Sequence, residues 1–270
     1  MFRPLHKHTL PSCALAVFGA TIVACLQGGS LVREGQTVVV DSGRENWRLE
    51  WRTPPKLVCF PGADDGDWYT CPCAGFEFGE QGALDLVRRT PGGREERLPL
   101  APLFQDTEHP GSRNEAVLRR WPLLTADTLP EDPGLAGRVR ERPPAAVMML
   151  ADFDRDGRST EFLFRVGTEP CAHIIDLLIG ISRDRPTLHL FTSAEHPERP
   201  LILDEPVWEG LLRSPRGVAT VVDQQCGDHG SDQMTEVALQ ALHGVLHATR
   251  RAYECTNDGK RGRLVSAQVL

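Results

Sequence analysis

The sequence lacks the short motifs that identify most of the common enzyme classes. It contains no G-x-S-x-G, no H-E-x-x-H, no G-x-x-x-x-G-K-[ST] phosphate loop and no strand-linked G-x-G-x-x-G. A C-x-x-C-H haem attachment motif is missing as well. These absences argue against nucleophile-elbow hydrolases, zinc peptidases, P-loop and dinucleotide enzymes, and c-type cytochromes. We therefore expect a protein that is not an enzyme.

The chain also has no surplus of basic charge and few long apolar runs. It carries 30 Lys and Arg against 37 Asp and Glu, a net charge of −7. Contact with nucleic-acid phosphates needs a basic face, so we expect no nucleic-acid partner. After residue 25 no run is long and apolar enough to span a bilayer.

Residues 1–25 have the pattern of an export signal. Arg3 and Lys7 precede an apolar stretch, Leu10–Ala24, that is too short for a good membrane span. Its end, Ile22-Val23-Ala24-Cys25, resembles the lipobox of bacterial lipoproteins, whose cysteine is lipidated and becomes the mature N-terminus. We expect a periplasmic or outer-membrane-associated lipoprotein that meets the membrane through lipid on Cys25. The alternative is an ordinary signal peptide and a secreted protein.

Cysteine usage agrees with an oxidising compartment. Of eight cysteines, two lie in the signal segment and an even six remain. Six cysteines allow many pairings, and the sequence alone does not choose among them. We expect Cys59 to pair with Cys71 or Cys73. We also expect Cys226 to pair with Cys255. The candidates are Cys59, Cys71, Cys73, Cys171, Cys226 and Cys255.

Zinc binding is the alternative for some of these cysteines. Cys71-Pro72-Cys73 has a C-x-C spacing but lacks a matching second pair. Cys226, His229, His243 and His247 are spaced like a zinc finger in which histidine replaces one cysteine. That site requires a helix through the last two histidines and a cysteine free of any disulfide. We expect neither site to hold zinc.

Beyond a polar spacer at residues 26–35, residues 36–270 have the pattern of one β-rich domain, with an insertion or boundary at 106–144. Trp47–Trp51 alternates large apolar with charged side chains, as half-buried strands do. The expected fold is all-β and disulfide-stapled, built of antiparallel four-stranded meanders in a propeller-like arrangement, with a β-sandwich as the alternative. Strands are expected at Thr37–Val40, Trp47–Trp51, Leu57–Phe60, Ala83–Thr90, Arg94–Leu100, Ala116–Leu124, Val147–Leu150, Glu161–Val166, Ile174–Ser182, Thr187–Thr192, Leu201–Leu203, Val207–Leu212, Gly217–Asp223, Glu236–Leu242 and Val245–Tyr253.

The segment Thr235–Arg251 fits two structures. Its good helix formers place several apolar residues on one helical face, but His243-Gly244 also suits a two-residue hairpin turn. Glycine in mid-helix costs about 1 kcal/mol, whereas it favours a hairpin turn. We therefore favour the hairpin.

The most informative stretch is the acidic loop, Asp152–Gly157, with aspartate at its first, third and fifth positions. Three alternating carboxylates suit a hard cation such as Ca²⁺, and the glycine allows the sharp turn around it. The carbonyl of Arg158 and the hydroxyl of Thr160, directly or through a water, are the further expected ligands. An EF-hand needs glutamate where this chain has Leu163, and extended flanks also argue against one.

The loop and its flanking apolar runs, Val147–Val166, resemble the FG-GAP or VCBS repeat. Its pattern D-x-[DN]-x-D-G-x-x-D links two strands of a propeller blade, as in integrin α-chains. This chain departs at Thr160, where the family usually has a carboxylate. The resemblance implies structural Ca²⁺ held weakly, with a dissociation constant of about 10⁻⁴–10⁻³ M. It also implies recognition of an envelope protein or glycan.

The expected role is therefore binding or structural. The alternative is a metal-assisted envelope hydrolase whose metal lies in the Asp152–Asp156 cluster, which requires an open coordination position and a nearby acid or base.

Asp64–Asp67 is a weaker acidic turn without the alternating pattern. We expect the tryptophans to anchor the core rather than to line a sugar site. They are Trp47, Trp51, Trp68, Trp121 and Trp208.

Overall fold

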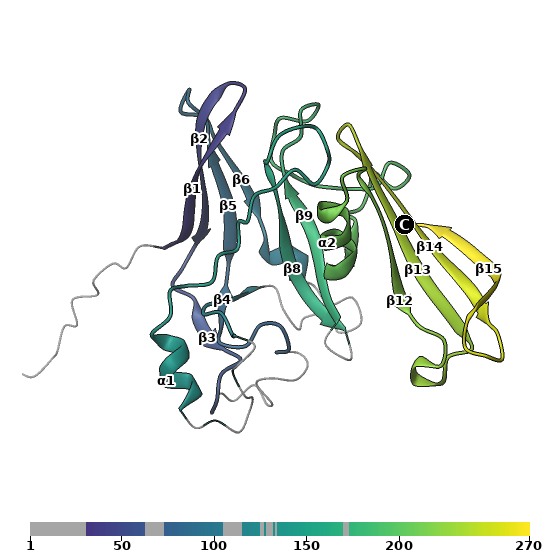
Figure 1. Ribbon diagram of the computed structural model, residues 1–270. Helices are drawn as coiled ribbons and strands as arrows, with labels where there is room; N and C mark the ends of the chain where they lie inside the picture. The colour runs from purple at the N-terminus through teal and green to yellow at the C-terminus, as the bar shows by residue number, and fades with distance from the viewer. Residues whose placement is uncertain are drawn as a thin grey trace, which may run out of the picture. The chain divides into compact units, whose positions relative to one another are not determined.

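The computed structural model describes residues 31–62, 73–104, 115–124, 127, 132, 134–169 and 173–270. Residues 31–270 belong to one contact unit. Its strand ladders are all antiparallel (Figure 1), which confirms the expected mostly β, antiparallel fold. The elements of the described residues are β1 (Val32–Val40), β2 (Gly43–Trp51), β3 (Lys56–Val58), β4 (Gly79–Gly82), β5 (Leu84–Arg89), β6 (Glu95–Pro99), β7 (Ala116–Arg119), α1 (Leu135–Arg140), β8 (Glu161–Glu169), β9 (His173–Gly180), β10 (His189–Leu190), β11 (Ile202–Asp204), α2 (Glu205–Arg213), β12 (Val218–Gln224), β13 (Gln233–Leu242), β14 (Val245–Cys255) and β15 (Arg261–Val269).

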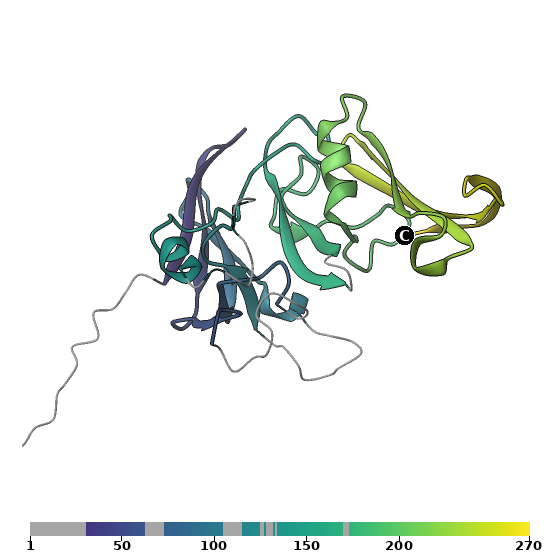
Figure 2. The ribbon, with the colours of Figure 1, turned by 60° about the horizontal axis from the view of Figure 1, so that its bottom comes forward.

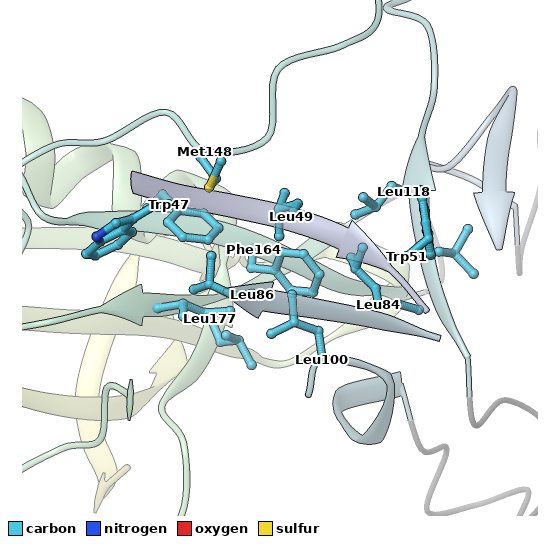
Figure 3. Close-up of a cluster of buried hydrophobic side chains, with 14 of the residues drawn as sticks. Trp47, Leu49, Trp51, Leu84, Leu86, Leu100, Leu118, Met148, Phe164 and Leu177 are labelled. Carbon is cyan, nitrogen blue, oxygen red and sulfur yellow. The ribbon is translucent and has the colours of Figure 1, made fainter. Parts of the chain in front are cut away.

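The N-terminal sheet has the strand order β1-β2-β5-β6 and carries the first core. Along β2 the side chains of Trp47, Leu49 and Trp51 are buried, while the charged residues between them are half-buried. Figure 3 shows these side chains beside Phe164 of β8 and Leu177 of β9. Burial of each such side chain contributes about 1.5–3 kcal/mol, so the alternation fixes which face of β2 turns inward. The strands of a smaller sheet, β3-β4-β7, alternate along the chain with those of the first sheet.

The central sheet is built on β9, which pairs with β8 along one edge and with β10 and β11 along the other. Phe162 and Phe164 of β8 belong to the first core. Leu178 of β9 belongs to a second core, and Leu163 packs against it. The sheet is therefore buried on both faces, which explains why β9 (HIIDLLIG) is apolar at consecutive positions rather than at alternate ones.

Helix α2 occupies the segment Val207–Leu212 that the sequence predicts as a strand, so that prediction is wrong. Pro206 lies in the first turn, where its missing N–H costs nothing. Helical spacing puts Val207, Trp208 and Leu211 on one buried face of the second core. Figures 1 and 2 show α2 between the central sheet and β12, in agreement with its contacts.

The C-terminal sheet has the order β12-β13-β14-β15. His243 and Gly244 form the turn between β13 and β14, with φ angles of 50° and 86°. Positive φ at both positions is the geometry of a tight hairpin turn, so the hairpin is confirmed and the helix is excluded. The strand β15 was not expected, because most of its side chains are exposed and it lacks a strong apolar pattern.

Two disulfides close local loops, as expected. Cys59 is bonded to Cys73, with Cα atoms 5.3 Å apart, and Cys226 to Cys255, with Cα atoms 5.6 Å apart. The bonded Cys73 and Cys226 are therefore not free to bind zinc. The cysteines at positions 25, 71 and 171 lie outside the described residues, as do the whole export signal and the acidic turn at 64–67.

Several further boundaries differ from expectation; for example, the strand expected at Thr187–Thr192 is reduced to β10. β1 begins inside the expected spacer, because Arg33 finds a buried partner in Glu80 at 2.8 Å. The run 147–150 is not a strand; the N–H groups of Val147 and Met148 donate to the carboxylate of Glu34 instead. In the segment 106–144, partly outside the described residues, the expected strand is shorter and α1 follows it. Trp47, Trp51 and Trp208 are core anchors, as expected.

Candidate metal centre

The acidic loop is closed at its base by a two-residue bridge. The N–H of Ala151 donates to the carbonyl of Glu161 at 2.8 Å, and the reverse bond is 3.3 Å long. Within the loop, Arg155 and Gly157 have φ angles of 59° and 91°. The glycine supplies the turn that the sequence predicted, since a Cβ is disfavoured in this region.

The three aspartates lie together. One carboxylate oxygen from each of Asp152, Asp154 and Asp156 falls within 4.8 Å of the others. Asp154 is fully buried; its Oδ1 accepts the N–H of Asp156 at 3.0 Å, and its Oδ2 has no hydrogen-bond partner among the described residues. Asp152 Oδ1 is likewise buried and without a partner there. Buried oxygens of this kind are costly unless a donor or a cation meets them, so the donor set fits a hard cation.

Electrostatics around Asp154 point the same way. Burial raises its pKa to about 7, and repulsion from Asp156 and Asp152 adds to the rise, against the backbone hydrogen bond and Arg158. Desolvation and like charge both disfavour the ionised form. A bound cation reverses both effects, because it replaces the missing solvation with direct coordination.

Asp156 is in a different state from its neighbour. Burial acts to raise its pKa, but the Arg158 side chain and the N–H of Arg183 outweigh burial and lower it. Arg158 Nη2 lies 2.9 Å from Asp156 Oδ2, and the Arg183 N–H donates to the same oxygen at 2.5 Å. The sequence predicts that the carbonyl oxygen of Arg158 is a metal ligand. In the structure its guanidinium is already a counter-ion for one of the three carboxylates.

Thr160 and Glu161 form the inner wall of the loop. The Thr160 hydroxyl lies 2.9 Å from the Ile181 carbonyl and 2.6 Å from Glu161 Oε1, while Glu161 Oε2 accepts the N–H of Phe153 at 2.9 Å. Burial, reinforced by Asp154, raises the pKa of Glu161 to about 8. The Thr160 hydroxyl donates to Glu161 Oε1, and this bond acts against the rise in pKa.

Glu161 is the residue that the sequence reasoning missed. It is completely buried, and it follows directly on Thr160, where the repeat pattern has its last carboxylate. A repeat pattern in which the last carboxylate may stand one position later includes Glu161. Repulsion from Asp154 helps to raise the pKa of Glu161, so this fourth acidic group is coupled electrostatically to the aspartate cluster.

The loop also joins elements that are distant in the sequence. Arg155 Nη2 donates to the carbonyls of Leu211 and Ser214, both at 2.8 Å, at the end of α2. The Gly244 N–H donates to the Asp154 carbonyl at 2.9 Å. Inside the loop, Phe153 packs edge-on against Trp208, with ring centroids 6.4 Å apart. The loop therefore holds α2 and the β13–β14 turn against the start of β8.

The zinc-finger-like constellation is not assembled. Cys226 is in a disulfide, and His243 forms the hairpin turn. His247 Nδ1 lies 2.6 Å from Glu195 Oε1. The side chain of the histidine at position 229 is outside what the structure describes.

Comparison of the chain with protein-family models, curated proteins and solved structures finds no match. The likeness to the FG-GAP repeat therefore rests on the residues of the loop alone. In the described part of the chain, no helix has both the length and the apolar character needed to cross a membrane.

Proposed function

We propose that the protein is an exported, lipid-anchored binding protein of the bacterial envelope, and that its acidic loop is a calcium-stabilised clip. The observation that carries the proposal is the fully buried Asp154, whose Oδ2 has no partner among the described residues and lies in a cluster with Asp152 and Asp156. Calcium held by oxygens of this kind neutralises their repulsion.

The proposed role of the ion is structural. The loop that would hold it already contacts α2 through Arg155 and the β13–β14 turn through Asp154. Among the described residues, the charged side chain bonded to Asp156 is that of Arg158, and an arginine is not a general base. The proposed ion locks these elements together through the loop's own contacts.

Calcium binding is tested by the melting temperature with millimolar calcium and with chelator. At ten times its dissociation constant, calcium stabilises the fold by about 1.4 kcal/mol, which raises Tm by about 3–5 °C. Asp154→Asn abolishes the shift and, at pH 8 in chelator, raises Tm because it removes a buried charge. The matched control is Asp184→Asn at an exposed position, which keeps the calcium shift. An unchanged Tm, with no calcium found by elemental analysis, refutes the clip.

Export and anchoring are supported by the two disulfides, which persist in oxidising compartments. Mass spectrometry of the mature N-terminus is expected to show a lipid-modified Cys25, and Cys25→Ser is expected to leave the protein unlipidated. A mature terminus that lies beyond Cys25 and carries no lipid contradicts this part of the proposal.

The partner is proposed to be an envelope protein or glycan, and the propeller-like arrangement of the sheets stays part of this proposal, with the β-sandwich as its alternative. The non-catalytic role is tested with chromogenic glycosides and phosphoesters. Turnover that disappears in Asp154→Ala would establish the metal-assisted hydrolase instead.

A further inference from the structure

A cavity of about 250 Å³ lies apart from the acidic loop. It is formed where β7, β8 and β9 meet the segment 145–149 and the start of α2. Leu118 of β7 and Leu163 of β8 contribute to its apolar wall. An apolar cavity of about 150 Å³ holds a benzene molecule, so this one has room for a ring and a small polar head.

The polar end of the cavity has a buried donor without a hydrogen-bond partner among the described residues, beside a carboxylate. Arg165 and Asp176 are directly paired residues of the β8–β9 ladder. Arg165 Nη1 donates to the Gly75 carbonyl at 2.8 Å and Nη2 to Glu205 Oε1 at 3.3 Å. Its Nε is buried and has no hydrogen-bond partner within the described residues.

Asp176 is only 4 % exposed, and its carboxylate makes no hydrogen bond to any described residue. Its Oδ1 lies 4.0 Å from Arg165 Nε. That distance is too long for a hydrogen bond and leaves room for a bridging atom. Both groups line the cavity, so a molecule in the cavity can reach them together.

The charges around the cavity nearly cancel. Arg119 is ion-paired with Glu77, and Arg165 with Glu205 and, at 4.0 Å, with Asp176. Burial raises the pKa of Asp176 to about 7, which leaves it largely uncharged in mildly acidic solution. A charged ligand would enter without a free counter-ion, and burying an unpaired charge is costly.

We propose that this cavity binds a small neutral amphiphile, whose amide or hydroxyl head accepts a hydrogen bond from Arg165 Nε and donates one to Asp176. The apolar body of this molecule lies against Leu118 and Leu163. The proposal is independent of calcium and of the acidic loop. It goes beyond the proposed function because it assigns a ligand class to a second site.

Three probes that share one ring and differ in the charge of their heads test the ligand class. Benzamide is neutral, benzoate is an anion and benzylamine is a cation. Chemical-shift titration of the isotope-labelled protein at pH 6.5 is expected to show benzamide binding at least about tenfold more tightly than either charged probe. The perturbed methyl groups are expected to include those of Leu118 and Leu163.

Two variants locate the binding. Ala145→Leu fills the cavity from a residue that lines it, while the backbone bonds of Ala145 to Arg120 and Arg33 are kept. Asp176→Val removes the acceptor with little change of shape. Both are expected to weaken benzamide binding by about tenfold or more. Asp184→Val, at an exposed position, is the matched control and is expected to bind like the wild type.

The outcomes are decisive in either direction. Benzoate or benzylamine binding as tightly as benzamide overturns the neutral ligand class. If benzamide causes the same chemical-shift changes in Ala145→Leu as in the wild type, and the Tm shows that the variant is folded, benzamide binds elsewhere. That result overturns the proposed site. If benzamide causes no chemical-shift change at about 10 mM, the proposed ligand class is wrong. The cavity then holds only water, and a bridging water accounts for the 4.0 Å between Arg165 Nε and Asp176 Oδ1.

Discussion

Asp154 and Asp156 are two positions apart, yet their surroundings set opposite protonation preferences. The carboxylate of Asp156 has the Arg158 guanidinium and two backbone N–H groups, whereas Asp154 has one N–H and an oxygen without a described partner. Local donors therefore decide which acid stays ionised, and burial alone does not. The same contrast separates Asp176, which has only a distant guanidinium, from the well-paired surface acids.

The pH dependence of stability is predicted from Asp176. Burial raises its pKa from 3.8 to about 7, with Glu205, Glu209 and Asp204 adding to the rise and Arg165 opposing it. Between pH 4 and 7 the folded state keeps a proton that the unfolded state has lost, so stability falls as pH rises through this window. Asp176→Asn removes this cost, and its stability relative to wild type is expected to grow by on the order of 4 kcal/mol from pH 4 to pH 8.

The measurement is urea unfolding of wild type and variant at several pH values in chelator. Asp154 and Glu161 also have raised pKa values, but their contribution is common to both proteins and cancels in the difference. Asp184→Asn serves as the exposed control. A difference that does not change with pH contradicts the assignment of the raised pKa to Asp176.

Single turns position whole elements in this fold. The β13–β14 turn fixes the ten-residue register of its hairpin and places the Gly244 N–H on the Asp154 carbonyl. At the other side of the loop, the Arg155 side chain satisfies carbonyls at the C-terminal end of α2, where helical partners run out. The acidic loop is thus held by the ends of two elements rather than by their middles.

Gly244→Ala is predicted to destabilise the protein by about 1–2 kcal/mol, because φ is 86° at this position and a Cβ is disfavoured there. Gly137→Ala is the control. It lies inside α1, where an added Cβ meets nothing within 4 Å, and is expected to stabilise by about 0.5–1 kcal/mol. Chemical denaturation measures both. Equal effects of the two substitutions would argue against the strained turn.

Local patterns predicted much of this architecture, and long-range contacts account for the rest. The Trp47–Trp51 alternation and the His243-Gly244 turn were correct because a two-residue period and a positive-φ turn are local properties. Val207–Leu212 was wrong because a short apolar run fits either a strand or one helical face. Glu161 was missed because its role comes from burial against a distant core, which no local spacing records.

Across the molecule, the two disulfides staple segments at opposite ends of the described chain. They span 14 and 29 residues, and removing either is expected to cost about 3 kcal/mol, somewhat more for the longer loop. The bond at Cys59 is completely buried, whereas Cys226 is partly exposed. Mild reductant is therefore expected to open Cys226–Cys255 first.

Thiol labelling followed by mass spectrometry checks the order of reduction, and urea unfolding of the two double alanine variants checks the energies. Simultaneous labelling of both pairs in the native protein would show that burial does not protect the first one.

The central sheet is the wall that both cores share, because β8 and β9 are buried on both faces. Neither core can unfold without exposing one face of this sheet to solvent. Backbone amides in the middle of β8 and β9 will therefore exchange with solvent hydrogen only when the whole of residues 31–270 unfolds, whereas those of the exposed edge strand β15 will exchange through local fraying. The slowest amides would thus mark the β8–β9 ladder, and their exchange rate would report the global stability.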